Sequence, residues 1–291
     1  MIKTILVPLT PTGLDDRSLA AASIIARAFN AHIDAVHVRL DPVEVAVNMT
    51  SDASGSAGVL VPSLIDDLER GADERAAVAR EAFAAFLKRE AFPDNANQNS
   101  ARETASAQMH VETGQEIAWL LRYAITADLV VASRGPEEDT SMRPLLEALL
   151  MDSGRPLLVP ATEAPKTDLD NIVIAWKATP QTGRAVTAAM PFLRRAERVT
   201  AVTIVEEDES IADDTDKLSR YLGWHGVHAE IERVRSGPLD PVAALMQTAQ
   251  RRGANLVVLG AYGHSRLREW VFGGFTRQIL GDAAISVLFA H

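Results

Sequence analysis

The stretch that decides the fold is ANLVVLGAYG at residues 254–263, followed after nine further residues by GGFT at residues 273–276. The apolar run predicts a buried strand, and two glycines at its exit let the backbone approach other groups closely. Gly273 and Gly274 stand where a helix begins, with Thr276 in its first turn. Free amides at a helix N-terminus attract phosphate. The pattern therefore predicts either a phosphate-binding loop or a glycine-rich turn that binds nothing.

The chain repeats one plan at half-length. The matching strand patterns of the two halves lie at 5–9 and 172–176, 31–38 and 198–205, 111–114 and 234–237, 127–131 and 254–258, and 154–159 and 284–289. Strand and helix patterns alternate in each half, which is typical of a parallel sheet with helices on both faces. We therefore predict an α/β fold with two tandem doubly wound parallel five-stranded sheets, related by a pseudo-two-fold axis. The predicted domains are residues 1–161 and 170–291.

The first half carries additional length. Residues 41–62 are polar and contain Gly and Ser, and residues 93–107 are rich in Asn, Ser and Gln, which is typical of mobile segments. Between them, residues 63–90 place apolar side chains at helical spacing. A long helix is therefore predicted there.

Composition limits the classes of function. The chain has 291 residues, of which 47% are hydrophobic and only 5% aromatic, as in parallel α/β proteins. A net charge of −10 argues against binding of nucleic acid or of an anionic membrane. The absence of cysteine excludes disulfides and thiolate metal sites. The chain shows neither a signal-peptide plan nor an apolar run of membrane-spanning length. We therefore expect a cytoplasmic protein.

The glycine spacing and the duplicated strand order together resemble the universal stress protein family, in a tandem form that covers nearly the whole chain. The resemblance implies a stress-response or regulatory protein that binds ATP or another adenine nucleotide, with Mg²⁺ as an optional companion. It also implies that the halves pack as an intramolecular pseudo-dimer, and a homodimer of the whole chain stays open. The family's signature matches only the second half, at Gly260, Gly263, Gly273, Gly274 and Thr276.

Further site residues follow from the same resemblance. The adenine pocket of the family is built largely from main-chain groups at the ends of the first two strands, and the matching positions, with one more closing the wall, are Ala175, Trp176, Ile204 and Leu259. Two residues lie inside the glycine motif: His264 and Phe275. Lys177 stands where the family commonly has an Asp, and either reaches a phosphate as a point charge or is a solvated turn lysine. Thr179 is expected to cap the following helix.

The first half departs from the signature. Ala132 lies near the place of the first glycine, and Pro144 stands where the second glycine pair is missing. Proline has no amide hydrogen to offer to a phosphate. We therefore expect the first half to be degenerate as a nucleotide site, so that one chain holds at most one nucleotide.

Two other functions were weighed. One is an interaction module of the same family that has lost nucleotide binding, which Lys177 and the missing hydroxyl at Gly274 favour. The other is an ATP pyrophosphatase of the wider adenine nucleotide α-hydrolase group, whose Ser-Gly-Gly-x-Asp-Ser loop is absent from residues 9–14. Neither a Gly-x-Ser-x-Gly elbow nor a Walker Lys-Ser pair occurs. We predict no enzyme, with weak ATP hydrolysis left open, and neither catalytic nor metal-binding residues.

Overall fold

The computed structural model describes residues 1–10, 15–51, 62–93, 104–134, 142–161, 169–205, 214–236, 240–261 and 285–291. Within them the chain forms a ten-stranded sheet of order β3-β2-β1-β4-β5-β10-β9-β6-β7-β8. The strands are β1 (Thr4–Pro8), β2 (His32–Arg39), β3 (Ser106–Thr113), β4 (Leu129–Val131), β5 (Leu157–Val159), β6 (Asn171–Ala175), β7 (Arg198–Val205), β8 (Ala229–Arg235), β9 (Leu256–Gly260) and β10 (Ser286–Ala290).

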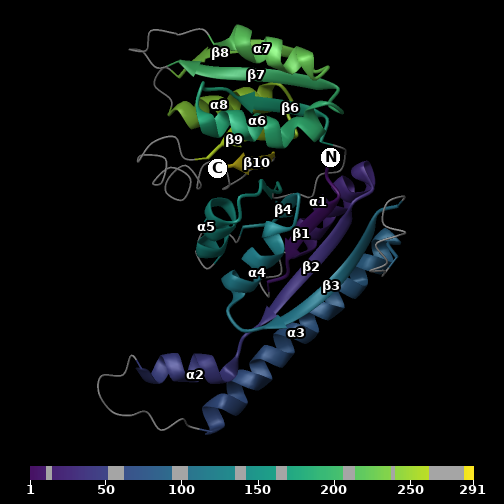
Figure 1. Cartoon of the computed structure of the whole chain (residues 1–291), viewed down its shortest axis with the longest axis vertical. Coiled ribbons are helices and arrows are strands. Elements are labelled where there is room, and N and C mark those ends of the chain that lie inside the picture. Colours follow the sequence, from purple (N-terminus) through teal and green to yellow (C-terminus); the bar gives the residue numbers. More distant parts are fainter. Residues whose placement is uncertain are drawn as a thin grey trace.

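The five strands of each half run parallel to one another, which confirms the prediction for the fold class. We expected two separate sheets, and here the structure corrects the expectation. The edge strands β5 and β10 pair antiparallel, with Leu158 opposite Leu288, so that the halves share one continuous sheet (Figure 1). The strands β6 to β10 of the second half correspond to β1 to β5 of the first half. When the strands of each half are counted in this way, the order from either outer edge to the middle of the sheet is third, second, first, fourth, fifth, as a two-fold axis between β5 and β10 requires.

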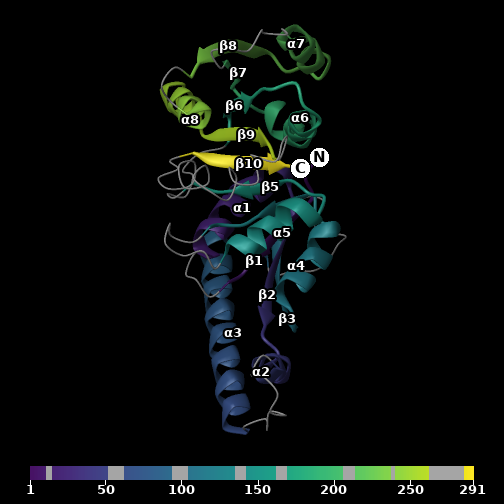
Figure 2. The ribbon, with the colours of Figure 1, turned by 90° about the vertical axis from the view of Figure 1, so that its left-hand side faces the viewer.

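Helices cover both faces of the sheet. They are α1 (Asp15–Phe29), α2 (Pro42–Ser51), α3 (Pro62–Glu90), α4 (Glu116–Ile125), α5 (Arg143–Asp152), α6 (Pro180–Leu193), α7 (Thr215–Trp224) and α8 (Pro241–Arg251). Buried side chains of α1, α3, α6 and α7 form one core with the sheet, and those of α4, α5 and α8 form a second core. Figure 2 shows this separation in the second half, where α6 and α8 lie on opposite sides of the strands.

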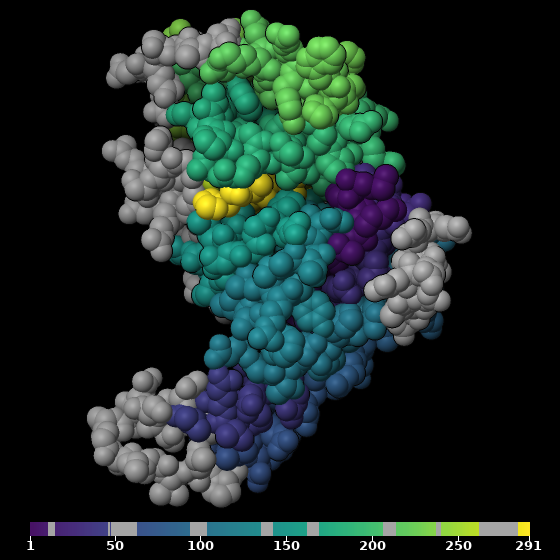
Figure 3. Space-filling model, viewed as in Figure 1, coloured from purple at the N-terminus to yellow at the C-terminus, as the bar shows by residue number. Residues whose placement is uncertain are grey.

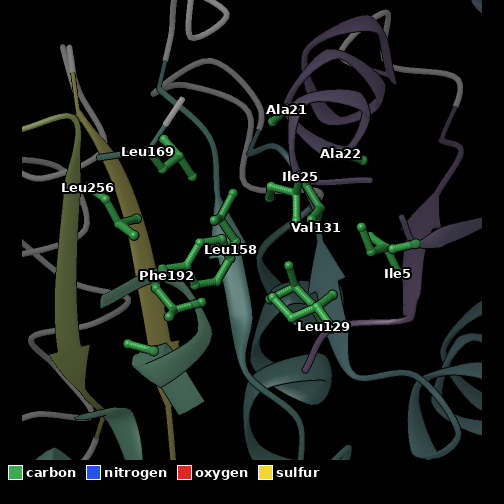
Figure 4. Packing of buried hydrophobic residues seen from close by; sticks show 14 of the residues in the cluster. Ile5, Ala21, Ala22, Ile25, Leu129, Val131, Leu158, Leu169, Phe192 and Leu256 are labelled. Carbon is green, nitrogen blue, oxygen red and sulfur yellow. The ribbon is translucent and has the colours of Figure 1, made fainter. Parts of the chain in front are cut away.

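Each core continues from one half into the other. Leu158 of β5 is fully buried and belongs to the same core as Leu256 and Phe192 of the second half. Figure 4 shows Leu158 between these residues and Val131 of the first half. Across the junction, the rings of Phe29 in α1 and Phe192 in α6 meet edge to face, with centroids 5.5 Å apart. The burial of apolar surface, which is the main stabilising contribution to folding, therefore links the halves as well as completing each one.

The additional length of the first half forms a projecting arm. The predicted long helix is present as α3, and α2 lies within the polar segment that precedes it. In Figure 1 both helices extend beyond the sheet. No helix in the described part of the chain combines the length and the hydropathy that a membrane crossing demands.

Candidate functional site

The carboxyl ends of β6 and β9 border a topological switch point in the second half. The chain continues from β6 to β7 on one side and from β9 to β10 on the other, and β6 and β9 are neighbours, with Ile174 opposite Val258. Open parallel sheets bind ligands in the crevice beside such a point, because the loops there diverge. Ala175 ends β6 and Gly260 ends β9, so two of the predicted positions border this crevice.

The predicted lining residues divide between the two faces of the sheet. Ala175, Ile204 and Leu259 pack on the side of α8, where they extend one hydrophobic core. Trp176 packs on the side of α6 and α7, and its backbone amide donates to the carbonyl of Val202 at 2.8 Å. The structure therefore brings three of the four residues together. The fourth residue, Trp176, lies on the opposite face of the sheet.

Gly260 has a packing role that needs no ligand. A Cβ atom at this position would lie 2.7 Å from the carbonyl carbon of Gln181 and 2.8 Å from the Cα of Thr182, and would also meet the amide nitrogen of Thr182. These atoms form the first turn of α6, so the helix can rest on the end of β9 only because Gly260 has no side chain. The close approach that the sequence indicated at this glycine is an approach of helix α6.

The turn between β6 and α6 is fixed by local hydrogen bonds. Thr179 is the N-cap of α6, as expected, and its Oγ1 accepts a hydrogen bond from the amide of Thr182 at 3.3 Å. The amide of Thr179 donates to the carbonyl of Lys177 at 2.7 Å. The side chain of Lys177 is exposed. Lys177 thereby places an exposed cation two residues after the end of β6, at the position where the resemblance implies a carboxylate.

The remaining predicted residues fall outside the described residues. They are Gly263, His264, Gly273, Gly274, Phe275 and Thr276, all within 262–284. The two ends of this segment are placed. Ala261 follows β9 directly, with its amide donating to the carbonyl of Ala290 at 2.8 Å, and Ile285 precedes β10. The glycine motif therefore leaves the sheet at the edge of the crevice.

At the equivalent position of the first half, the described polar side chains form hydrogen bonds with one another and with the backbone. The amide of Thr10, after β1, donates to Oδ1 of Asp15 at 2.8 Å. Burial raises the pKa of Asp15 to about 7, although the hydrogen bonds from Thr10 act in the opposite direction. Ser133, which matches Gly260 in strand register, forms a hydrogen bond of 2.8 Å with Ser18 through its Oγ, and its amide donates to the same Ser18 oxygen.

The helix that follows this first-half crevice is also a poor phosphate seat. Pro144 lies in the first turn of α5, where it removes one amide donor, and no side chain of the described residues caps the helix. The buried polar groups described above are paired with one another. That the first half is degenerate as a nucleotide site stays a prediction.

The described residues do not fit a protein-held Mg²⁺. Magnesium prefers oxygen ligands and is commonly held by one or two carboxylates together with substrate phosphates. Within the described ranges, His, Asp and Glu side chains form no group of three that could hold a metal ion. The turn at the second-half crevice contributes Lys177 in place of a carboxylate.

Comparison with known proteins gives a family match for the second half. The model of the Universal stress protein family matches residues 169–291. No curated protein matches the chain. Among solved structures, the match with a universal stress protein from Archaeoglobus fulgidus DSM 4304 covers 99% of this chain and 95% of that protein's chain, with a TM-score of 0.65 at 13% identity. A functionally unknown protein from Pseudomonas aeruginosa PAO1 covers 99% and 92%, with a TM-score of 0.55 at 14% identity. Both show that the fold of the whole chain recurs.

Proposed function

Because residues 169–291 match the model of the Universal stress protein family, we propose that the second half binds ATP or a related adenine nucleotide at the carboxyl ends of β6 and β9. The observation that carries the proposal is the position of the glycine motif, which begins at the end of β9 beside the switch point of the sheet. Amides at the start of the following helix would hold the phosphates. The apolar groups of Ala175, Ile204 and Leu259 would contact the base.

The protein would act as a stress-response or regulatory binding protein. No general base is aimed at a phosphate in this proposal, so nucleotide occupancy, and not turnover, would carry the signal. The first half would contribute the other five strands of the shared sheet and would bind no nucleotide of its own. One chain would therefore bind one nucleotide.

The experiment is isothermal titration calorimetry of the whole chain with ATP, ADP, AMP and cAMP, each with and without Mg²⁺. cAMP belongs in this series because a universal stress protein has been solved in complex with it. We expect at most one site per chain. Two equivalent sites would contradict the prediction that the first half is degenerate. Nucleotide carried through purification is read by denaturing the protein and applying the supernatant to ion-exchange chromatography.

A matched variant tests the phosphate seat directly. Gly274→Asp would place a carboxylate at the helix N-terminus, where it repels phosphate. The expected loss of ATP affinity is about 2–4 kcal/mol, from charge-assisted amide hydrogen bonds that are no longer made. A folded variant with unchanged ATP affinity would refute this site.

The second candidate is an interaction module of the same family that binds no nucleotide. Two observations favour it: Lys177 replaces the usual carboxylate, and helix packing alone accounts for Gly260. In that case no nucleotide would bind at millimolar concentration. The same titrations decide between the two functions.

A further inference from the structure

We propose that a groove beside α6 and α7 is a second ligand site, which takes a small organic anion with an aromatic or other apolar body. The groove has a volume of about 820 Å³. It is formed by the N-terminal part of α6, by α7, by residues 154–156 of the first half and by the last two residues, 290 and 291. Figure 3 shows these parts on one face, with α7 and α6 above the yellow C-terminal residues. Ligand sites for small molecules commonly have volumes of about 300–1,000 Å³.

The apolar part of the groove is prepared by the fold. Trp176 at the end of β6 forms one wall, and Tyr221 of α7 is partly exposed on another. Leu218 and Val186 also line the groove and belong to the hydrophobic core, at 2% and 1% exposure. Two aromatic residues and two core aliphatic residues on one groove suit an apolar ligand, because aromatic rings offer a large contact area.

The charged part of the groove is cationic, although the chain as a whole carries a net charge of −10. Among the described residues, Arg155, Arg184 and Lys217 line it, together with the side-chain carboxylate of Asp214 and the last residue, His291. Lys217 lies 2.6 Å from Asp214, so this pair is close to neutral. The guanidinium of Arg155 donates to the carbonyl of Ile125, a neutral group, and within the described ranges Arg155 forms no ion pair.

Arg184 supplies the second uncompensated charge. In the part of the chain that the structure describes, its side chain makes neither a hydrogen bond nor an ion pair, and the residue is exposed on α6. Arg155 comes from the first half of the chain and Arg184 from the second. A ligand held by both would therefore contact the two halves at their junction. An anion with an apolar body fits this combination of charge and surface.

The groove is separate from the proposed nucleotide crevice. Among the described residues predicted for the nucleotide, only Trp176 lines it. Ala175, Ile204 and Leu259 pack on the opposite face of the sheet. The two proposals can therefore succeed or fail independently.

One glycine allows the groove to be blocked without damage to the fold. Gly183 lines the groove on α6, and a Cβ atom there would meet nothing within 4 Å. Gly183→Leu therefore places a side chain into open space, and leucine is also the better helix former. Gly223 on α7 has the same open surroundings but does not line the groove. Gly223→Leu is thus the matched control.

The test is a fluorescence titration of the whole chain with anilinonaphthalene sulfonate, an aromatic anion, and with its uncharged counterpart N-phenylnaphthylamine. We expect a saturable site for the anion. Gly183→Leu should remove binding of both probes, whereas Gly223→Leu should change neither. Arg184→Glu should lower the affinity for the anionic probe roughly tenfold at low salt, with a smaller effect at high salt. It should leave the affinity for the uncharged probe unchanged.

Three results would overturn the proposal. The first is unchanged probe binding in Gly183→Leu with a native circular dichroism spectrum. The second is equal weakening of both probes by Arg184→Glu, which would leave the charge without a role. The third is displacement of the probe by ATP, which would make the groove part of the nucleotide crevice. Gly274→Asp, which should weaken ATP binding, is expected to leave probe affinity unchanged, so failure of one proposal is distinguishable from failure of the other.

Discussion

Replacement of Gly260 by alanine should destabilise the second half of the protein. The added Cβ atom would lie 2.7 Å from the carbonyl carbon of Gln181 and still closer to the amide nitrogen of Thr182, whereas ordinary contact begins at 3.4 Å, so α6 would have to move by 0.7 Å or more. The helix cannot move freely, because Ala185 and Ala189 are fully buried against the sheet. Overpacking of this kind costs about 1–3 kcal/mol, and contact with backbone in place of a flexible side chain sets the expectation at the upper end.

Equilibrium urea unfolding followed by circular dichroism measures this change, with Gly183→Ala as the control. Gly183 lies in the same helix, and an added Cβ there meets nothing within 4 Å. The control should be neutral or more stable by up to about 1 kcal/mol, because alanine is the better helix former. The midpoint for Gly260→Ala should fall clearly below both the control and the native protein. If Gly260→Ala and Gly183→Ala unfold alike, helix packing does not explain this glycine.

Three further predictions concern charged groups. If Lys177 contacts a phosphate, Lys177→Ala should weaken ATP more than adenosine in calorimetry, with the difference shrinking as salt rises; equal small effects on both ligands would remove that role. The pKa of Asp15 is raised from 3.8 to about 7 by burial, so its contribution to the free energy of unfolding should decline as the pH rises from about 4 to about 7, and Asp15→Asn should lack that decline in urea unfolding. Burial raises the pKa of Asp34, but hydrogen bonds from His110 and His32 outweigh it and lower the pKa well below its usual range, while the same contact with Asp34 raises the pKa of His110 above 6.5. The contribution of Asp34 is thus lost as the pH falls through its folded pKa, and that of His110 as the pH rises through its own, so Asp34→Asn should lower the pKa of His110 in an NMR titration.

Local patterns in the sequence predicted the strands, the long helix α3 and the cap at Thr179, because each depends on neighbouring residues. The division of Ala175 and Trp176 between the two faces also follows from the alternation of side chains along a strand. That rule was available from the sequence, and it indicates that the side chains of consecutive residues at a strand end point to opposite faces of the sheet.

Other features depend on residues far apart in the chain. The short apolar run of β5 reads the same whether it forms a free edge or pairs with β10, so the pairing of Leu158 with Leu288 could not be predicted from either run. The groove, too, depends on residues that lie far apart in the chain. It unites Arg155 of the first half with Arg184 and Lys217 of the second, and no local pattern connects these three residues. The role of Gly260 became clear only when α6 was placed against β9.

The antiparallel pairing of β5 and β10 also has a consequence for dilution. Two separate subunits that met through such edges would separate as their concentration fell, because their stability depends on the amount of protomer present. Here both strands belong to one chain, so their association is intramolecular and is set by an effective concentration that dilution does not change. The first half can thus lack a ligand of its own and still cover an edge that the second half would otherwise expose to other chains.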